Sequence, residues 1–268
     1  MVIRTLLSAA PIPRLDAEIL LAHVLGIRRE KLLFMYNETV APSVAAAFSV
    51  LSKKRQAGCP VAYLVGEKEF YSLPFYVDEN TLIPRPDTET LVEWAIPRAR
   101  DARVLDICCG TGCVGITTAV HASPKSLTLL DISLAALAVA EKNAARHGVS
   151  AEFLCRDILK EALPQTYDLI LSNPPYIETD VIATLSKDVR EFEPHLALDG
   201  GDDGLLFYPV IIEKAAAALP PGGWLGLEIG YTQSGAVASM LSSHFTDVSV
   251  LFDLAGNARG VVGRKKDV

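Results

Sequence analysis

The chain has 268 residues, 50% of them hydrophobic, with 25 Lys and Arg against 32 Asp and Glu, a formal net charge of −7. That length allows one large α/β domain, or one standard domain with a small appendage. All of the net negative charge lies after residue 80, whereas nucleic-acid-binding proteins usually carry a basic stripe that neutralises phosphates. We therefore expect no direct nucleic-acid partner. No apolar run approaches the roughly 18 residues of a membrane span, so we also expect no membrane partner.

The first 65 residues predict helices. The N-terminus has an apolar stretch shorter than the roughly 7–15 residues of a signal-peptide core, and we read it as the start of a first helix. Apolar residues recur at helical spacing over 13–26 and over 42–58, and each run starts at a proline and ends at a glycine. Aromatic and β-branched residues then surround Ser72-Leu73-Pro74, which predicts a short hairpin over 66–86 that connects two domains.

From about residue 88, strand-like and helix-like segments alternate. The expected strands cover residues 103–107, 126–130, 151–155, 167–172, 223–229, 247–252 and 260–263. The expected helices between them cover residues 114–121, 134–147, 205–219 and 233–243. Alternation with nearly continuous apolar strands predicts a parallel sheet covered by helices on both faces. The last two strands are joined by a short loop, so we expect them to form an antiparallel pair at the sheet edge.

Together these elements predict an α/β fold: a Rossmann-like, seven-stranded, mostly parallel sheet with a small all-helical N-terminal domain and a hairpin linker. The expected domain boundaries are residues 1–65 for the helical domain, 66–87 for the linker and 88–268 for the α/β domain.

The chain has five cysteines, and Cys108, Cys109 and Cys113 crowd one turn. No second CxxC pair or histidine cluster completes a zinc set, so we expect no metal site. We expect reduced thiols and a cytoplasmic location.

Residues 104–115 predict a strand, a glycine-rich turn and a helix, an arrangement that places a ligand at the carboxyl end of a strand. Gly110, Gly112 and Gly115 also fit the GxGxxG pattern of nicotinamide enzymes. Asp106 separates the two possibilities, because a carboxylate beside this turn repels a pyrophosphate and attracts a cation. S-adenosylmethionine, which presents a sulfonium and an ammonium group, fits this carboxylate. The alternative is that Asp106 only caps the helix or accepts loop amides.

Two more carboxylates follow the next strands. Asp131 ends the second strand, where it can accept both ribose hydroxyls of a nucleoside; it can also cap the following helix, although Ser133 is an equally good cap. Asp157, just beyond the third strand, can accept an adenine amino group or stabilise its own loop. Both readings stay open for each residue.

Asn173-Pro174-Pro175-Tyr176 follows the fourth strand and is the most specific motif in the chain. Two prolines fix two successive φ angles and remove two donors, which leaves a rigid backbone that presents acceptors. The Asn173 side-chain oxygen and the Pro174 carbonyl can accept both hydrogens of a planar amide or amino group, and Tyr176 can stack on it. This predicts methyl transfer to such a nitrogen, with catalysis resting chiefly on positioning. The alternative is an ordinary proline turn that leaves a strand.

At this point the chain resembles a known family, the HemK-type protein-(glutamine-N5) methyltransferases of peptide chain release factors, within the class I S-adenosylmethionine methyltransferases. The likeness covers nearly the whole length. The motifs that carry it are RLDAEILLAH (14–23), PVAYLVG (60–66), EFYSLPF (69–75), LIPRPDTE (82–89), SNPPYI (172–177) and VREFEP (189–194). The Asn-Pro-Pro-Tyr motif is shared with adenine-N6 and guanine-N2 methyltransferases, whereas LIPRPDTE and the helical N-terminal domain are more specific.

The resemblance implies that the chain methylates the Gln of the Gly-Gly-Gln motif in class 1 release factors, as a monomer, and that the helical domain helps to dock them. The cofactor-binding residues it implies are Asp106, Cys108, Gly110, Gly112, Asp131, Ile132, Asp157, Ile158 and Asn173. The substrate-binding residues are Asn173, Pro174, Pro175, Tyr176, Arg85 and Glu193, of which Asn173, Pro174 and Tyr176 are the catalytic ones.

The chain departs from the family pattern at two places. Cys108 stands where the first glycine of the Asp-x-Gly-x-Gly-x-Gly loop is expected, and a cysteine there requires an allowed φ. Glu191 is an extra residue in the last motif, which leaves the roles of Arg190 and Glu193 open. Arg85 and Glu89 can shape the entrance to the site or form an ion pair.

Three other functions compete with this one. The shared Asn-Pro-Pro-Tyr motif also suits a DNA or RNA amino-methyltransferase, the helical N-terminus suits a non-catalytic binding module, and GxGxxG suits a nicotinamide enzyme. The acidic second half of the chain disfavours a nucleic-acid substrate. The intact glycine-rich loop and Asn-Pro-Pro-Tyr motif disfavour a non-catalytic module, and Asp106 disfavours a nicotinamide cofactor.

Overall fold

The structure is a computed structural model, and it describes residues 1–267. The chain forms two compact units: one combines Met1–Glu67 with Ser186–Phe192, and the other combines Lys68–Leu185 with the chain from Glu193 onward. Among the described residues, no helix is both long enough and apolar enough to span a membrane.

The first unit is helical, as the sequence predicts. Its helices are α1 (Ile3–Ser8), α2 (Arg14–Leu25), α3 (Arg29–Leu32), the short turn η1 (Leu33–Met35), α4 (Pro42–Gln56), α5 (Val61–Val65) and α10 (Lys187–Phe192). Helix α2 ends at Gly26, whose left-handed backbone costs a glycine little, and α4 starts at Pro42. The buried side chains of Ile3, Leu20 and Phe48 belong to a core of this unit's own.

The second unit begins with a two-stranded sheet of β1 (Glu67–Phe70) and β2 (Leu73–Tyr76). Tyr71 and Ser72 join the strands with φ angles of 51° and 61°, the left-handed values that a two-residue hairpin turn requires. Phe70 and Phe75 are buried and pack edge to face, with ring centroids 6.1 Å apart. The hairpin is therefore anchored in the core of the second unit.

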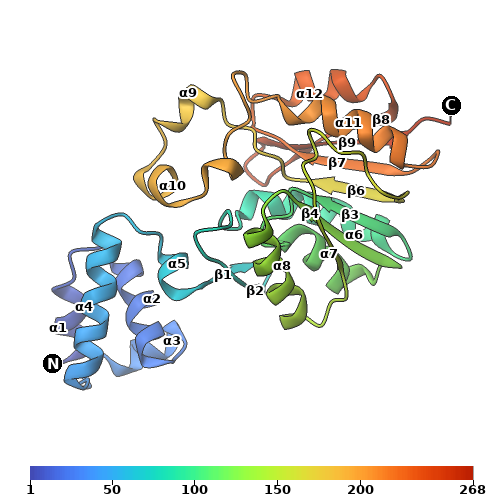
Figure 1. Ribbon diagram of the computed structural model, residues 1–268. Helices are drawn as coiled ribbons and strands as arrows, with labels where there is room; N and C mark the ends of the chain where they lie inside the picture. The colour runs from blue at the N-terminus through green and yellow to red at the C-terminus, as the bar shows by residue number, and fades with distance from the viewer. Residues whose placement is uncertain (268) are drawn as a thin grey trace. The chain divides into compact units, whose positions relative to one another are not determined.

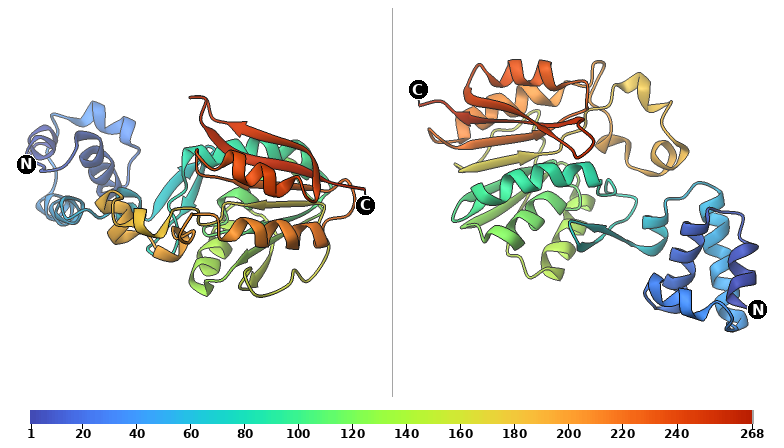
Figure 2. Two further views of the ribbon diagram at one scale, coloured as in Figure 1. Left: turned by 90° about the horizontal axis from the view of Figure 1, so that it is seen from above. Right: turned by 180° about the vertical axis from the view of Figure 1, so that it is seen from behind.

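The main sheet has seven strands in the order β5-β4-β3-β6-β7-β9-β8, and Figures 1 and 2 show it between two layers of helices. Its strands are β3 (Arg103–Ile107), β4 (Ser126–Asp131), β5 (Glu152–Cys155), β6 (Leu169–Ser172), β7 (Trp224–Glu228), β8 (Phe245–Phe252) and β9 (Ala258–Lys265). The first five of these strands run parallel, and β9 is antiparallel to both β7 and β8. The chain moves outward from β3 to β5 on one side and from β6 to β7 on the other. The order therefore reverses between β3 and β6, the place where open α/β sheets bind ligands.

Helices cover both faces of this sheet, each over its own apolar cluster. One face is covered by α6 (Glu89–Ala99), α7 (Cys113–Ala122) and α8 (Leu134–Arg146). The other is covered by α11 (Phe207–Ala218) and α12 (Ser234–Leu241). Side chains of β6 alternate between the two clusters: Leu169 and Leu171 belong to the first and Ile170 to the second, the two-residue period of a strand buried on both faces.

The predicted fold class is confirmed, and the seven predicted strands are present with ends within two residues of the expected ones. The antiparallel pair at the edge is also present. The sequence reading left three helices out: α6, the short α9 (Thr179–Ile182) and α10, as well as the turns η2 (Pro86–Thr88) and η3 (His195–Ala197). Helix α6 is hard to recognise because Pro97 lies inside it.

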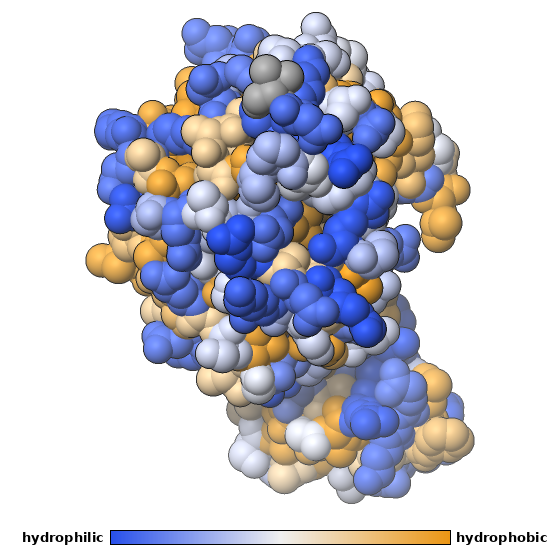
Figure 3. All heavy atoms as spheres, turned by 90° about the vertical axis from the view of Figure 1, so that its right-hand side faces the viewer, coloured by the Kyte–Doolittle hydropathy of each residue, from blue (hydrophilic) through white to orange (hydrophobic). Residues whose placement is uncertain are grey.

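The face shown in Figure 3 is mostly hydrophilic, with apolar residues scattered over it in small patches. This pattern is usual for a protein surface, where single exposed apolar side chains are common.

Candidate active site

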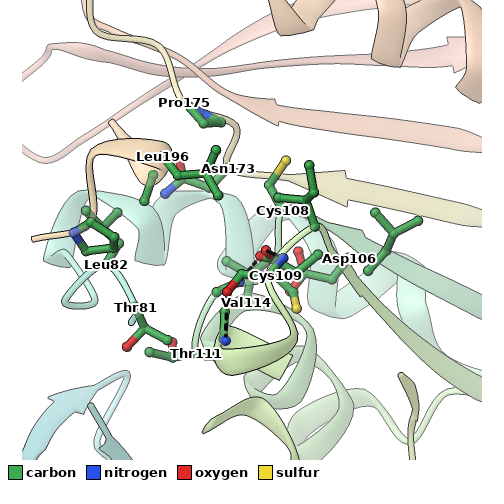
Figure 4. Close-up of a pocket in the computed structure, with 18 of the residues that line it drawn as sticks. Thr81, Leu82, Asp106, Cys108, Cys109, Thr111, Val114, Asn173, Pro175 and Leu196 are labelled. Atoms are coloured by element: carbon green, nitrogen blue, oxygen red, sulfur yellow. Dashed lines mark hydrogen bonds between the residues drawn. The ribbon is translucent and has the colours of Figure 1, made fainter. Parts of the chain in front are cut away.

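A cavity of about 280 Å³ lies at the carboxyl ends of β3, β4 and β6. The residues that line it come from the glycine-rich turn after β3, the ends of β4 and β5, the motif after β6, and two further segments, 79–88 and 194–197. In Figure 4, Asn173, Pro175 and Leu196 form one side of the pocket, Asp106, Cys108 and Cys109 another, and Thr81 and Leu82 a third. The fold thus brings together segments that are far apart in the sequence.

Asp106 lies at the bottom of the glycine-rich turn and is only 1% exposed. Its Oδ2 accepts the Gly115 N–H at 2.9 Å, in the first turn of α7. A Cβ on Gly115 would lie 2.7 Å from Leu129 and 3.0 Å from the Asp106 Cβ, so this close approach requires glycine. Burial raises the pKa of Asp106 to about 7, and the Gly115 hydrogen bond only partly offsets this. The carboxyl accepts a loop amide and also lines the cavity, so the two readings of Asp106 are compatible.

Cys108 also lines the cavity, with a φ of 57°. The cysteine therefore takes the left-handed conformation that glycine usually supplies, at a cost of roughly 1–2 kcal/mol. Burial raises the pKa of the Cys108, Cys109 and Cys113 thiols, so they stay protonated and are poor nucleophiles. None of the five cysteines, all of which the structure describes, forms a disulfide.

Asp131 holds the turn from the neighbouring strand. Its Oδ2 accepts the Gly110 N–H and its Oδ1 accepts the Ser133 N–H, each at 2.9 Å. The cap of α8 is Ser133, whose Oγ accepts the Ala136 N–H at 3.1 Å. Asp131 is therefore not the residue that caps this helix, and its carboxylate lies on the cavity wall with its pKa raised by burial.

Asp157 lines the cavity and also makes contacts within its own loop. Its Oδ1 accepts the Leu159 N–H at 2.9 Å, and its Oδ2 lies 2.8 Å from the Lys160 Nζ. The hydrogen bond and charge of Lys160 lower the pKa of Asp157. Ile158 is buried and Ile132 is exposed, and both line the cavity.

Only part of the Asn-Pro-Pro-Tyr motif lines the cavity. Asn173 and Pro175 line the cavity, whereas Pro174 is buried. Tyr176 donates its hydroxyl to Glu228 Oε1 at 3.4 Å, and its pKa is raised, mainly by burial. Neither Pro174 nor Tyr176 is among the described residues that line the cavity. Stacking of Tyr176 on a substrate stays a prediction.

Arg85 and Glu193, both predicted to bind substrate, pair with each other. Arg85 Nη2 lies 2.5 Å from Glu193 Oε1, and Glu193 Oε2 accepts the Ile83 N–H at 3.2 Å. Glu193 is 6% exposed, and Arg85 lines the cavity. Glu89 instead accepts the Tyr71 N–H at 2.8 Å. The ion pair thus joins the segment before α6 to the segment after α10.

Several residues that line the cavity were not predicted as site residues. They include Glu79, Asn80, Thr81, Leu82, Pro84, Thr88, Pro194, Leu196, Ala197 and Phe207. Glu228, behind the cavity, was also missed. The sequence could have indicated Glu228, because a carboxylate at the carboxyl end of a buried apolar strand is unusual.

Three features define the class of protein: the order of the strands in the sheet, the glycine-rich turn after β3, and the Asn-Pro-Pro-Tyr turn after β6 at the same cavity. The protein is a methyltransferase with a Rossmann-like fold. Solved structures support this fold. A methyltransferase from Pyrococcus furiosus superimposes with a TM-score of 0.58 at 17% identity, covering 80% of this chain and 99% of that one. The T. thermophilus 16S rRNA N2 G1207 methyltransferase RsmC, in complex with AdoMet and guanosine, gives 0.50 at 18% identity, covering 75% of this chain and 50% of that one.

Sequence comparisons are more specific. The family model "Methyltransferase small domain" matches residues 86–202, and "PrmC N-terminal domain" matches residues 2–66. The release factor glutamine methyltransferase of Cereibacter sphaeroides is 44% identical to this chain, and the alignment covers 93% of this chain and 90% of the relative. The release factor glutamine methyltransferase of Nitratidesulfovibrio vulgaris is 40% identical, and the alignment covers 98% of this chain and 92% of the relative. The chain belongs to the release factor glutamine methyltransferase family, and it is an enzyme of that family.

Proposed function

We propose that this enzyme transfers a methyl group from S-adenosylmethionine to the side-chain amide nitrogen (N5) of the Gln in the Gly-Gly-Gln motif of class 1 release factors. The observation that carries the proposal is the position of Asn173 on the wall of the cavity that Asp106 and Asp131 also line. An acceptor for amide hydrogens and a set of carboxylates suited to a cation thus share one cavity. Family membership supports the choice of substrate.

The residues of the cavity fit the cofactor. The carboxylates of Asp106, Asp131 and Asp157 suit a ligand with a cationic group and a ribose, since carboxylates attract cations and accept hydroxyl donors. S-adenosylmethionine supplies the methyl group from its sulfonium. We propose that Asp106 favours the positive charge, that Asp131 holds the ribose and that Asp157 lies near the adenine. Gly110 and Gly112 shape the turn, and both have positive φ angles.

The substrate amide needs orientation more than it needs a base. Its nitrogen lone pair is delocalised, and the nitrogen becomes acidic as it is alkylated, so the proton leaves with or after methyl transfer. Asn173 Oδ1 and the Pro174 carbonyl would accept the two amide hydrogens and hold the nitrogen towards the donor. Positioning of this kind contributes roughly 7–11 kcal/mol in favourable intramolecular reactions.

The release factor would be the partner in the cytoplasm, where translation ends, and we propose that the enzyme acts as a monomer. Residues 1–65 would dock the release factor, 66–87 would link the domains and 88–268 would carry out the chemistry. A DNA or RNA amino-methyltransferase remains the alternative, but the relatives named above favour the protein substrate.

The test compares substrates and one variant. Purified enzyme with labelled S-adenosylmethionine should label an intact release factor and leave cellular RNA and DNA unlabelled. Asn173→Ala should abolish labelling while calorimetry still detects cofactor binding. Labelling of nucleic acid alone, or full activity of Asn173→Ala, would contradict the proposal.

A further inference from the structure

The sheet places Asn173 beside a buried acid. In the parallel pair β6–β7, Ser172 lies opposite Leu227, so the next residues along the two strands are Asn173 and Glu228. Strand alternation directs both toward the face covered by α6, as Leu171 on β6 and Gly226 on β7 also show. Thr88 directly precedes α6, which packs over β6 and β7. Three polar residues from three segments therefore come together at the cavity wall, where Thr88 and Asn173 line the cavity and Glu228 does not.

Thr88 occupies a capping position but does not cap its helix. Its hydroxyl makes no cap hydrogen bond, although threonine is favoured at this position because it usually does. The hydroxyl is instead 3.3 Å from the Asn173 Nδ2, which donates to it. Thr88 is 2% exposed. The same hydroxyl faces the Glu228 carboxyl and acts to lower its pKa, so it contacts Asn173 and also faces Glu228.

We propose that Glu228 and Thr88 are positioning residues that fix the orientation of the Asn173 amide, so that its oxygen is available to the substrate nitrogen. A carboxylate can only accept hydrogen bonds, and a hydroxyl has a single hydrogen. When Thr88 donates that hydrogen to Glu228, its oxygen can only accept from Asn173. The Asn173 side chain must then present its NH2 group to Thr88, which leaves Oδ1 for the substrate. This inference rests on the proposed function.

The opposite orientation would work against catalysis. A flipped Asn173 would present an NH2 group to the substrate NH2, with donors facing donors. The two side-chain atoms are nearly the same size, so packing alone distinguishes them poorly. A fixed chain of hydrogen bonds distinguishes the two orientations well, because a flipped Asn173 would place its Oδ1 against the Thr88 oxygen with no hydrogen between them.

The surroundings of Glu228 agree with such a role. It is 2% exposed, and its Oε2 has no well-formed hydrogen bond within the described chain. Burying a carboxylate is costly, and this one ends an otherwise apolar strand. Four groups face it: the hydroxyls of Thr88 and Tyr176 and the charge of Arg259 favour its ionised form, and the charge of Asp87 opposes it.

Three substitutions test the chain of hydrogen bonds. Thr88→Val removes the hydroxyl at nearly constant shape, Thr88→Ser keeps it, and Glu228→Gln places an amide that can donate to Thr88 and so reverse the chain. We expect Thr88→Val and Glu228→Gln to lower kcat on the order of 10- to 100-fold, the size of a misplaced reacting group. The KM for the release factor and the Kd for S-adenosylmethionine should change by less than about threefold, and Thr88→Ser should restore most of kcat.

A matched control separates this effect from the loss of any buried hydroxyl. The Thr118 hydroxyl on α7 is buried and has no hydrogen-bond partner within the described chain, so Thr118→Val should keep the wild-type kcat. Glu228→Gln should also melt at a higher temperature than the wild type above pH 7, because burial raises the pKa of Glu228 to about 7 and its ionisation disfavours the folded state. Wild-type kcat in Thr88→Val or Glu228→Gln, or equal losses in Thr88→Val and Thr88→Ser, would overturn the proposal.

A second readout does not need the release factor. In ¹⁵N-labelled protein, the Asn173 side-chain amide protons should exchange slowly in the wild type and Thr88→Ser, and faster in Thr88→Val. Unchanged exchange in Thr88→Val would overturn the inference. If the wild type shows the protected amide but fails to methylate a release factor, the orientation stands and the proposed substrate is wrong.

Discussion

Among single residues, Asp106 bears most on the proposed cofactor binding, through its charge. The sequence placed a carboxylate beside a glycine-rich turn, and charge alone favoured a cationic ligand. The structure adds that this carboxyl is buried, which could not be read from the sequence, because burial depends on how Leu129 and α7 pack around it. Burial makes ionisation costly in the empty site, and a bound cation would recover that cost.

This coupling predicts a pH dependence of cofactor binding. Burial raises the pKa of Asp106 to about 7, and a bound cation favours its ionised form, so binding releases a proton below that pH. Affinity for S-adenosylmethionine should rise with pH by at most about tenfold per unit and level off above about pH 7. Calorimetry from about pH 5.5 to 8.5 checks this. Asp106→Asn serves as the control, since it should bind S-adenosylmethionine more weakly and lack the pH-dependent part of the affinity that Asp106 causes. Identical pH profiles for the wild type and Asp106→Asn would contradict the prediction.

Cys108 gives a second prediction at this scale. Its φ of 57° strains a cysteine, and Cys108→Gly relieves the strain but gives the unfolded chain more freedom. The two effects oppose each other, so the free energy of unfolding should change by less than about 1 kcal/mol and the cofactor Kd by less than about threefold. Cys108→Val, whose branched side chain tolerates left-handed backbone poorly, should be clearly less stable than either protein. Urea unfolding measures the order of stability of the three proteins. A Cys108→Val variant as stable as the wild type would refute the strain assigned to Cys108.

At the scale of elements, Glu193 connects two segments that line the cavity. It accepts the Ile83 N–H and pairs with Arg85, and Pro194 next to it is on the cavity wall. The sequence reading assigned both charged residues to the substrate, because nothing in the sequence shows that positions 108 residues apart are neighbours. In the structure the pair holds two segments of the cavity wall together, and the predicted contact with the substrate stays a prediction.

Removal of this pair should therefore affect stability and binding together. Glu193→Ala leaves a buried amide N–H and a guanidinium without their partner, so we expect a loss of about 1–3 kcal/mol and a weaker cofactor Kd. Arg85→Ala combined with Glu193→Ala should cost little more than Glu193→Ala alone. The partly exposed pair Arg103–Asp168 at the other end of β3 is the control, and Arg103→Ala should leave the Kd unchanged. A raised KM for the release factor with no change in stability would show that Arg85 and Glu193 act on the substrate.

The elements themselves show what a sequence can predict. Continuous apolar runs such as 169–171 identify buried parallel strands, and motifs at their carboxyl ends must meet at one edge of the sheet. This is why Asp106, Asp131 and Asn173 were expected together and line one cavity. The hydrogen bond between Asn173 and Thr88 and the position of Glu228 on the neighbouring strand could not be predicted, since they depend on β7 lying beside β6 and on α6 lying over both.

At the scale of the whole molecule, the chain combines a helical unit with a methyltransferase unit, and the acidic balance of the sequence lies almost entirely in the second. A family model matches each part separately, over residues 2–66 and 86–202. The relatives named above align with this chain over both parts.

We propose that Asn173 and Pro174 hold a glutamine amide against the methyl donor. A crystal structure of the enzyme with S-adenosylhomocysteine and a peptide containing Gly-Gly-Gln would test these two roles. We expect the amide NH2 to donate to Asn173 Oδ1 and to the Pro174 carbonyl, with its nitrogen facing the cofactor sulfur. A cofactor sulfur directed away from Asn173, with no space for an amide between them, would contradict it.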